Sequence, residues 1–224
     1  MVEDDNFIRE VNEEIRQEKL QKLWRNYGAL IIGAAILLVF AASGWAWYNK
    51  HMENRDNAAG DAMLAALQLA DRGDEAAFAK LTELEKSGIG GYPVLAKMRA
   101  AALLATKDDK AGAVAAYDAI AGDKTASQGI RDLAAIRAAY LLVDNGTLAD
   151  VRERVEALAT DVNPMRNLAR EALGLAAWKA GALDEATGYF TKNRDDQQPL
   201  AANLRERAQM MLDLISVQRG GAQK

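Results

Sequence analysis

Few side chains of this sequence have the chemistry of a catalytic or metal-binding site. The chain contains no cysteine and a single histidine, His51. Protein zinc sites take several ligands from Cys, His and acidic side chains, so Cys and His alone cannot assemble one here. His51 follows a long apolar run, and we expect it to lie at the edge of that run rather than to act as a base. The sequence therefore predicts no metal site and no nucleophilic thiol.

The remaining candidates are two pairs of acids, a glycine-rich stretch and a glycosylation-like triplet. Asp108 and Asp109, like Asp195 and Asp196, lie between periodic segments, where Asp favours turns and caps. Residues 87–91 are rich in glycine, but no strand precedes them, as a phosphate-binding loop would require. Residues 145–147 read Asn-Gly-Thr, which a tight turn explains fully. We therefore expect no enzyme activity, no catalytic residue, no cofactor and no small-molecule substrate.

One uncharged stretch governs how the rest of the chain is interpreted. Residues 28–48 carry no charge, and as a helix they span roughly 31 Å, close to the thickness of a bilayer core. Aromatic residues flank both ends, as in helices that cross a membrane: Trp24, Tyr27, Trp45, Trp47 and Tyr48. We predict a transmembrane helix over residues 27–48.

The alternative for this stretch is a cleaved signal peptide. Ala41, Ala42 and Ser43 offer small residues at a plausible cleavage position. However, the preceding segment is long and mixes acids with bases, and the apolar run continues beyond the small residues. Basic residues before the span outnumber those just after it by five to two, which predicts a cytoplasmic N-terminus. We expect a single-pass protein of a bacterial inner membrane with its C-terminal domain in the periplasm.

The composition of the chain favours helices and gives little support to nucleic-acid binding. Half of the residues are hydrophobic, only three are proline, and the formal net charge is −4. No run of Lys and Arg is dense enough to follow a phosphate backbone. Apolar residues recur at helical spacing after the span, which predicts an all-α domain. The predicted helices cover residues 58–69, 75–86, 93–106, 110–121, 128–143, 147–160, 164–180, 183–191 and 200–217.

The paired helices contain a repeat. In the segment REALGLAAWKAGALDEATGYF, Gly174 on one helix and Ala186 on the next are small, and Phe190 follows one turn later. This pattern resembles the tetratricopeptide repeat. Small residues let two antiparallel helices approach, and we expect Phe190 to fill the space against the next pair. Equivalent positions recur about 35 residues apart: Ala101, Ala113 and Tyr117; Ala139, Val151 and Val155; and, weakly, Ala65, Ala77 and Leu81. A generic Ala-rich bundle is the alternative.

Stacked helix pairs present a concave face built from the first helix of each pair. We expect a mostly apolar partner-binding groove there, with Tyr140 and Trp178 as anchors and Glu171 as its lone acid. The alternative is that the last helix of the chain covers these side chains. The expected groove residues are Leu95, Met98, Leu133, Ile136, Tyr140, Glu171, Leu175 and Trp178.

The layout as a whole resembles a known family. An amphipathic N-terminus (FIREVNEEIRQEKLQKLWRNYG), one span and a tetratricopeptide-like domain resemble the YfgM-like ancillary subunits of the bacterial Sec translocon, in an alphaproteobacterial form. The resemblance implies a non-enzymatic accessory subunit that associates with the SecYEG channel and with a membrane-anchored, PpiD-like periplasmic chaperone, and that helps to hand over emerging polypeptides. A scaffold for another envelope complex, in cell-wall synthesis, division or cytochrome maturation, is the alternative.

These inferences predict five segments. Residues 1–26 form a cytoplasmic amphipathic segment, which rests on the membrane surface or docks a partner. Residues 27–48 form the transmembrane helix, and 49–57 a linker. Residues 58–219 form the periplasmic domain, a solenoid of three to four helix pairs with a capping helix. Residues 220–224 form a disordered tail.

Overall fold

The computed structural model describes residues 3–197 and 202–221, and of residues 3–20 and 221 it describes the backbone alone. Within these ranges the chain forms nine α-helices and one short 3-10 helix, and it contains no strand. The predicted all-α fold is therefore confirmed. The chain divides into two compact units, Met1–Asn57 and Ala58–Lys224.

The described part of the first unit lies within one long helix, which continues into the second unit. Helix α1 (Glu3–Asp71) contains no proline, and its central part is rich in Ala, Leu and Ile, which favour a helix. Its most apolar window of 18 residues has a mean hydropathy of 2.2, and none of that window is buried. Leu37 and Phe40 are 71% and 72% exposed. Helix α1 is thus long and apolar enough to span a membrane. Residues 49–57, the expected linker, are helical.

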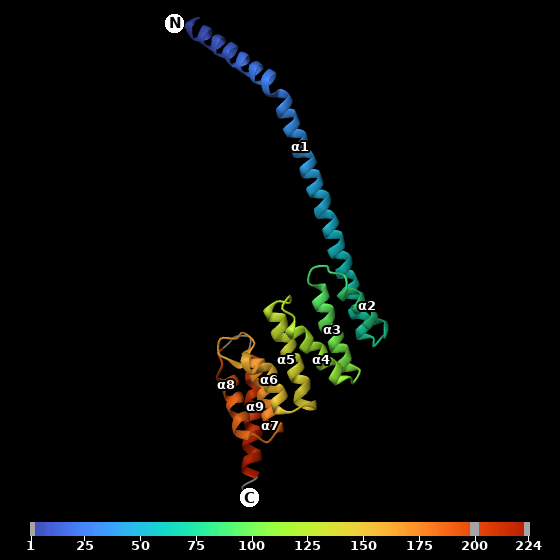
Figure 1. The fold of residues 1–224 in the computed structure, drawn as a ribbon. Helices are drawn as coiled ribbons and strands as arrows, with labels where there is room; N and C mark the ends of the chain where they lie inside the picture. Colours follow the sequence, from blue (N-terminus) through green and yellow to red (C-terminus); the bar gives the residue numbers. More distant parts are fainter. Residues whose placement is uncertain (1–2, 198–201, 222–224) are drawn as a thin grey trace. The chain divides into compact units, whose positions relative to one another are not determined.

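The second unit is a row of helix pairs, each helix turning back on the one before it (Figure 1). Residues 58–71 at the end of α1 pair with α2, α3 with α4, α5 with α6 and α7 with α8, and α9 packs on α8. Contacts of α2 with α3, α4 with α5 and α6 with α7 join successive pairs. The elements are α2 (Ala76–Glu85), α3 (Tyr92–Thr106), α4 (Lys110–Gly122), α5 (Gln128–Asn145), α6 (Leu148–Val155), the 3-10 helix η1 (Glu156–Ala159), α7 (Arg166–Lys179), α8 (Leu183–Asp195) and α9 (Ala202–Gly221).

Local signals set several of the turns between these helices. Gly181, with φ +76°, takes the left-handed conformation that ends α7, as the sequence predicts. Asp109 caps α4, because its side chain accepts a hydrogen bond from the Gly112 amide at 2.8 Å. Thr147 and Asp150 form a capping box at the start of α6, with both reciprocal bonds present.

Other helix ends differ from the predicted ones. The helix expected from residue 164 begins at Arg166, so Pro164 precedes it rather than forming its first turn. Asn163 still organises this turn, since its side chain accepts from the Met165 amide at 2.7 Å. The helix expected to reach residue 160 ends at Val155 and tightens into η1. Helix α9 includes Gly220 and Gly221, which the sequence placed in a tail, whereas 222–224 and the expected helix start at Leu200 lie outside the described residues.

The predicted repeat contact forms within one helix pair. A side chain added at Gly174 would place its Cβ 2.9 Å from the Phe190 ring, so α7 and α8 approach closely there. Phe190 is buried and also packs with Ala208 and Ile215 of α9. The ring therefore fills space within its own pair as well as toward the next element, which extends the predicted role.

The repeat register holds in the later pairs and shifts in the first. Ala113, Tyr117, Val151 and Val155 are all buried. In the first pair, however, Ala65 is exposed and Ala66 is completely buried, where it packs with α2 and α3. Ala77 and Leu81 of this pair are buried as predicted, so only the first-helix position moves, from Ala65 to Ala66.

Candidate partner-binding groove

The expected groove residues lie on the first helices of the last three pairs, but they are not equally accessible. Leu95 of α3 is 43% exposed, whereas Ile136 of α5 is 1% exposed and Glu171 of α7 is 6% exposed. The others are half-buried: Met98, Leu133, Tyr140, Leu175 and Trp178. On α3 and α5, Leu95, Met98 and Leu133 thus remain at least partly accessible.

Ile136 belongs to the protein core. It packs with Ala139 of α5, Val151 of α6 and Ala172 of α7. Because this side chain joins two helix pairs, it contributes to the shape of the face without being available for a partner. Helical spacing predicts on which side of α5 Ile136 lies, but it does not predict how deeply the side chain is buried.

Glu171 links three helices through charged hydrogen bonds. Arg207 of α9 donates to both of its carboxylate oxygens, at 2.6 and 2.7 Å. The Tyr140 hydroxyl of α5 donates to the same carboxylate and lies 3.4 Å from the Leu168 carbonyl oxygen. Burial and the adjacent Glu171 carboxylate raise the pKa of Tyr140, so the hydroxyl remains a donor at neutral pH. Glu171 is therefore occupied by the protein's own residues.

Helix α9 also covers part of the surface beside Trp178. The Trp178 indole N–H donates to the Gln218 side chain of α9 at 3.0 Å. A hollow of about 610 Å³ opens beside this contact, lined by Trp178, Met210, Asp213, Leu214, Val217 and Gln218. The C-terminal part of the expected groove is thus partly filled by the last helix, and Trp178 faces a new hollow instead.

A second hollow lies at the other end of the domain. It encloses about 250 Å³ between α2 and α4, with α3 as its floor. The small side chains of the alanines at positions 100, 101, 116 and 119 leave this space unfilled. Phe78, Glu85 and Lys97 also line it. The sequence analysis missed this hollow because alanine is also the residue that closes helix pairs.

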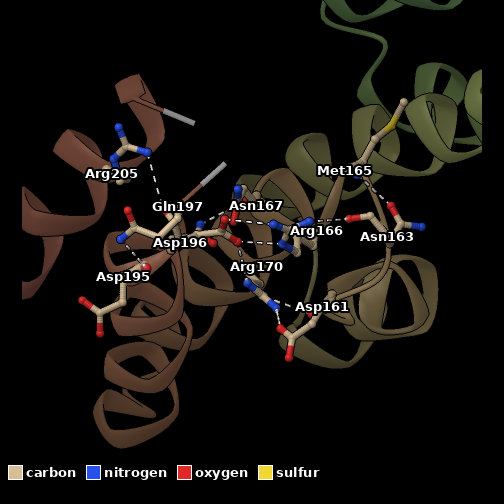
Figure 2. A network of polar contacts seen from close by, with 12 residues as sticks. Asp161, Asn163, Met165, Arg166, Asn167, Arg170, Asp195, Asp196, Gln197 and Arg205 are labelled. Atoms are coloured by element: carbon tan, nitrogen blue, oxygen red, sulfur yellow. Dashed lines mark hydrogen bonds and ion pairs between the residues drawn. The ribbon is translucent and has the colours of Figure 1, made fainter. Parts of the chain in front are cut away.

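Asp196, assigned to a turn by the sequence analysis, is the centre of a buried ion-pair network (Figure 2). Its side chain is 6% exposed and accepts from Arg166 at 2.6 and 2.9 Å and from Arg170 at 3.3 Å. Arg170 also pairs with Asp161 and donates to the Ala159 carbonyl at 3.0 Å. The Asp196 carbonyl accepts from Arg205 of α9 at 3.2 Å. These bonds join η1, α7, α8 and α9.

The other sequence candidates for chemistry have structural roles. Asp108 adopts a positive φ of 66° in the turn before α4. Residues 87–91 form the turn between α2 and α3, and Thr147 of the glycosylation-like triplet is engaged in the capping box. His51 is exposed, and its ring stacks on Trp47 with 5.7 Å between centroids. In the part of the chain that the structure describes, no three His, Cys or acidic side chains gather as metal ligands would.

The sequence matches the tetratricopeptide repeat-like domain family over residues 21–217. The chain belongs to this family. The matched segment includes the apolar part of α1 as well as all the helix pairs. Repeat domains of this kind are typically non-catalytic modules that bind other proteins on extended surfaces. No curated protein and no solved structure matched the sequence in the same comparisons.

Proposed function

We propose that this protein is a membrane-anchored scaffold whose repeat domain binds other proteins at the periplasmic side of a bacterial inner membrane. One chain carries an exposed apolar helix and a repeat domain of an interaction family, and this combination carries the proposal. The excess of basic residues before residue 28 favours a cytoplasmic N-terminus. Residues 1–26 are then cytoplasmic, 27–48 cross the membrane and 58–219 are periplasmic.

Within this role we propose an accessory subunit of the Sec translocon. The proposed partners are SecYEG and a PpiD-like membrane-anchored chaperone, and the proposal rests on the resemblance of the whole layout to YfgM-like proteins. The partner would contact the open part of the first-helix face, at Leu95, Met98 and Leu133, and reach toward Trp178. These side chains are apolar and at least partly accessible, as a peptide or helix anchor site requires.

Site-specific photo-crosslinking in intact membranes tests the proposal. We would place the photoreactive residue at Leu37 in the apolar helix and at Leu95 on the first-helix face, both well exposed. Val162, 89% exposed in the turn before α7, serves as the control position. We expect adducts with SecY or a periplasmic chaperone at Leu37 or Leu95 and not at Val162. Adducts only with cell-wall, division or cytochrome-maturation proteins would replace the translocon by another envelope complex.

A further inference from the structure

Helix α9 carries apolar residues on two opposite faces. On its inner face, Ala208 and Ile215 are buried against α7 and α8. On its outer face, Met210, Leu214 and Val217 are 65%, 47% and 75% exposed. The three outer residues are spaced by four and three positions, so they form one stripe along the helix. We call this stripe, together with Trp178, the α9 outer face.

The α9 outer face borders a hollow, and most of its hydrogen-bonding groups already have partners within the chain. The Trp178 N–H is bonded to Gln218, and the Gln209 amide donates to Asp213 at 2.8 Å. What remains for a ligand is apolar area and the Asp213 carboxylate, within a hollow of about 610 Å³. This lining suits apolar side chains better than a polar small molecule.

The α9 outer face lies on the last helix of the solenoid, where an exposed apolar surface is expected to be covered by another element. Each helix pair of a solenoid buries its apolar surface against the next, and a terminal helix is expected to show a polar outer side. The exposed apolar residues of α9 instead have the spacing at which one amphipathic helix packs against another. A methionine within such a surface lets it adapt to different partner side chains.

The charges around the α9 outer face favour a basic partner. Glu206 lies one turn before Met210, and Asp213 adjoins Leu214. Neither carboxylate has an ion-pair partner among the residues that the structure describes. The arginines nearby are engaged, because Arg207 binds Glu171 and Arg219 binds Asp184 at 2.6 Å. Two copies of this chain joined by two-fold symmetry at this face, with their α9 helices antiparallel, would set acids against acids.

We infer that the α9 outer face binds an amphipathic helix of another protein, whose apolar stripe is flanked by lysine or arginine. Its apolar residues at spacing i, i+3 or i+4, and i+7 would pack on Met210, Leu214 and Val217 beside the Trp178 ring. Its basic residues would pair with Glu206 and Asp213. This site lies beyond the first-helix face proposed above, shares only Trp178 with it, and does not depend on which envelope complex the protein serves.

Peptide binding to the full chain in nanodiscs of zwitterionic lipid tests this inference. The probes are two fluorescein-labelled amphipathic helices with the same leucine stripe, one flanked by lysine and the other by glutamate, and fluorescence anisotropy measures their binding. We expect the lysine-flanked helix to bind at least about tenfold more tightly. The double variant Met210→Ser with Val217→Ser should weaken this binding about tenfold or more. The matched control, Leu64→Ser with Val162→Ser, removes equally exposed apolar groups elsewhere and should leave it unchanged.

A charge-reversal variant tests the electrostatic part of the inference without removing the apolar contacts. Glu206→Lys with Asp213→Lys alters two exposed side chains, and it should reverse the preference toward the glutamate-flanked helix. Equal binding of the two peptides, or no response to this variant, would overturn the proposal. A dimer of the wild-type chain in sedimentation that dissociates in the Met210→Ser, Val217→Ser variant would also overturn it, because the face would then join two copies.

Discussion

At the scale of single residues, the close approach of Gly174 to the Phe190 ring limits what position 174 can carry. Gly174→Ala would force its Cβ to within 2.9 Å of the ring, so we expect the free energy of unfolding to fall by about 1–3 kcal/mol. Urea unfolding of the detergent-solubilised chain, followed by far-UV circular dichroism, measures this change. Gly188→Ala in α8 meets nothing within 4 Å and should be neutral or stabilising by up to about 1 kcal/mol. Equal effects of the two substitutions would mean that the ring moves aside freely.

Local contacts of this kind could be predicted from the sequence, whereas charged contacts could not. Gly174, Ala186 and Phe190 stand at fixed spacing within one helix pair, so their meeting follows from the repeat. Glu171 was expected to be the lone acid of an open groove, yet its partners Tyr140 and Arg207 stand 31 and 36 positions away in the sequence. No periodicity identifies which arginine will reach a given carboxylate, because many pairings satisfy the same pattern.

The same cluster predicts how stability depends on alkaline pH. Burial and the Glu171 carboxylate raise the pKa of Tyr140 in the folded chain, so above about pH 10 the unfolded chain loses a proton that the folded chain retains. Stability therefore falls as pH rises past 10, by about 1.4 kcal/mol per pH unit for this residue. Tyr140→Phe should make that decline shallower between about pH 10 and 11.5 in urea titrations. An unchanged slope would show that the hydroxyl titrates normally in the folded state.

At the scale of elements, ion pairs join α6 to α4, α6 to α8 and α9 to α8. Arg154 of α6 binds both oxygens of Asp118 of α4, at 2.9 and 2.7 Å. Arg152 of α6 binds Glu185 of α8, and Arg219 of α9 binds Asp184 of α8. No such pair joins α2 to α4 among the described residues, and the hollow edged by Phe78 lies there instead.

We predict that the Arg154–Asp118 pair contributes to stability through its geometry rather than its charge alone. Arg154→Lys keeps the charge but cannot form two parallel hydrogen bonds, so it should lower the free energy of unfolding by about 1 kcal/mol. A double-mutant cycle with Asp118→Asn measures the coupling. The exposed Lys80–Glu83 pair within α2 provides the control cycle, for which we expect a coupling near zero. Equal couplings for the two pairs would contradict the geometric argument.

The helix order could be read from the sequence because apolar periodicity, glycine turns and caps agree in most segments. The boundaries that moved lie where local signals compete. The Asn163 side chain and carbonyl accept from the Met165 and Arg166 amides, and this turn delays the start of α7 until Arg166. Residues after Val155 tighten into η1, where the Ala159 carbonyl accepts from Arg170. A tertiary bond of this kind is invisible to a pattern read along the chain.

In the proposed function, the two units divide the work of the whole molecule between anchoring and binding. Among the described residues, leucine and phenylalanine side chains of the apolar helix are exposed, and a bilayer would bury them. In the repeat domain, the contact of Gly174 with Phe190 and the Asp196 network hold helices together. Apolar groups remain accessible at Leu95 and along α9. Under the proposed function, the molecule would use separate surfaces for lipid and for protein.

The orientation of the chain across the membrane can be tested with cysteine labelling, because the sequence contains no cysteine of its own. Five basic residues before the span against two just after it predict that Val162→Cys faces the periplasm and Glu18→Cys the cytoplasm. In spheroplasts, a membrane-impermeant maleimide should therefore label Val162→Cys directly and Glu18→Cys only after lysis. The labelled Val162→Cys chain should keep its full mass near 24.3 kDa, since a permanent anchor is not removed. A shortened chain, together with loss of any Glu18→Cys label from the mature protein, would instead identify residues 28–48 as part of a cleaved signal peptide.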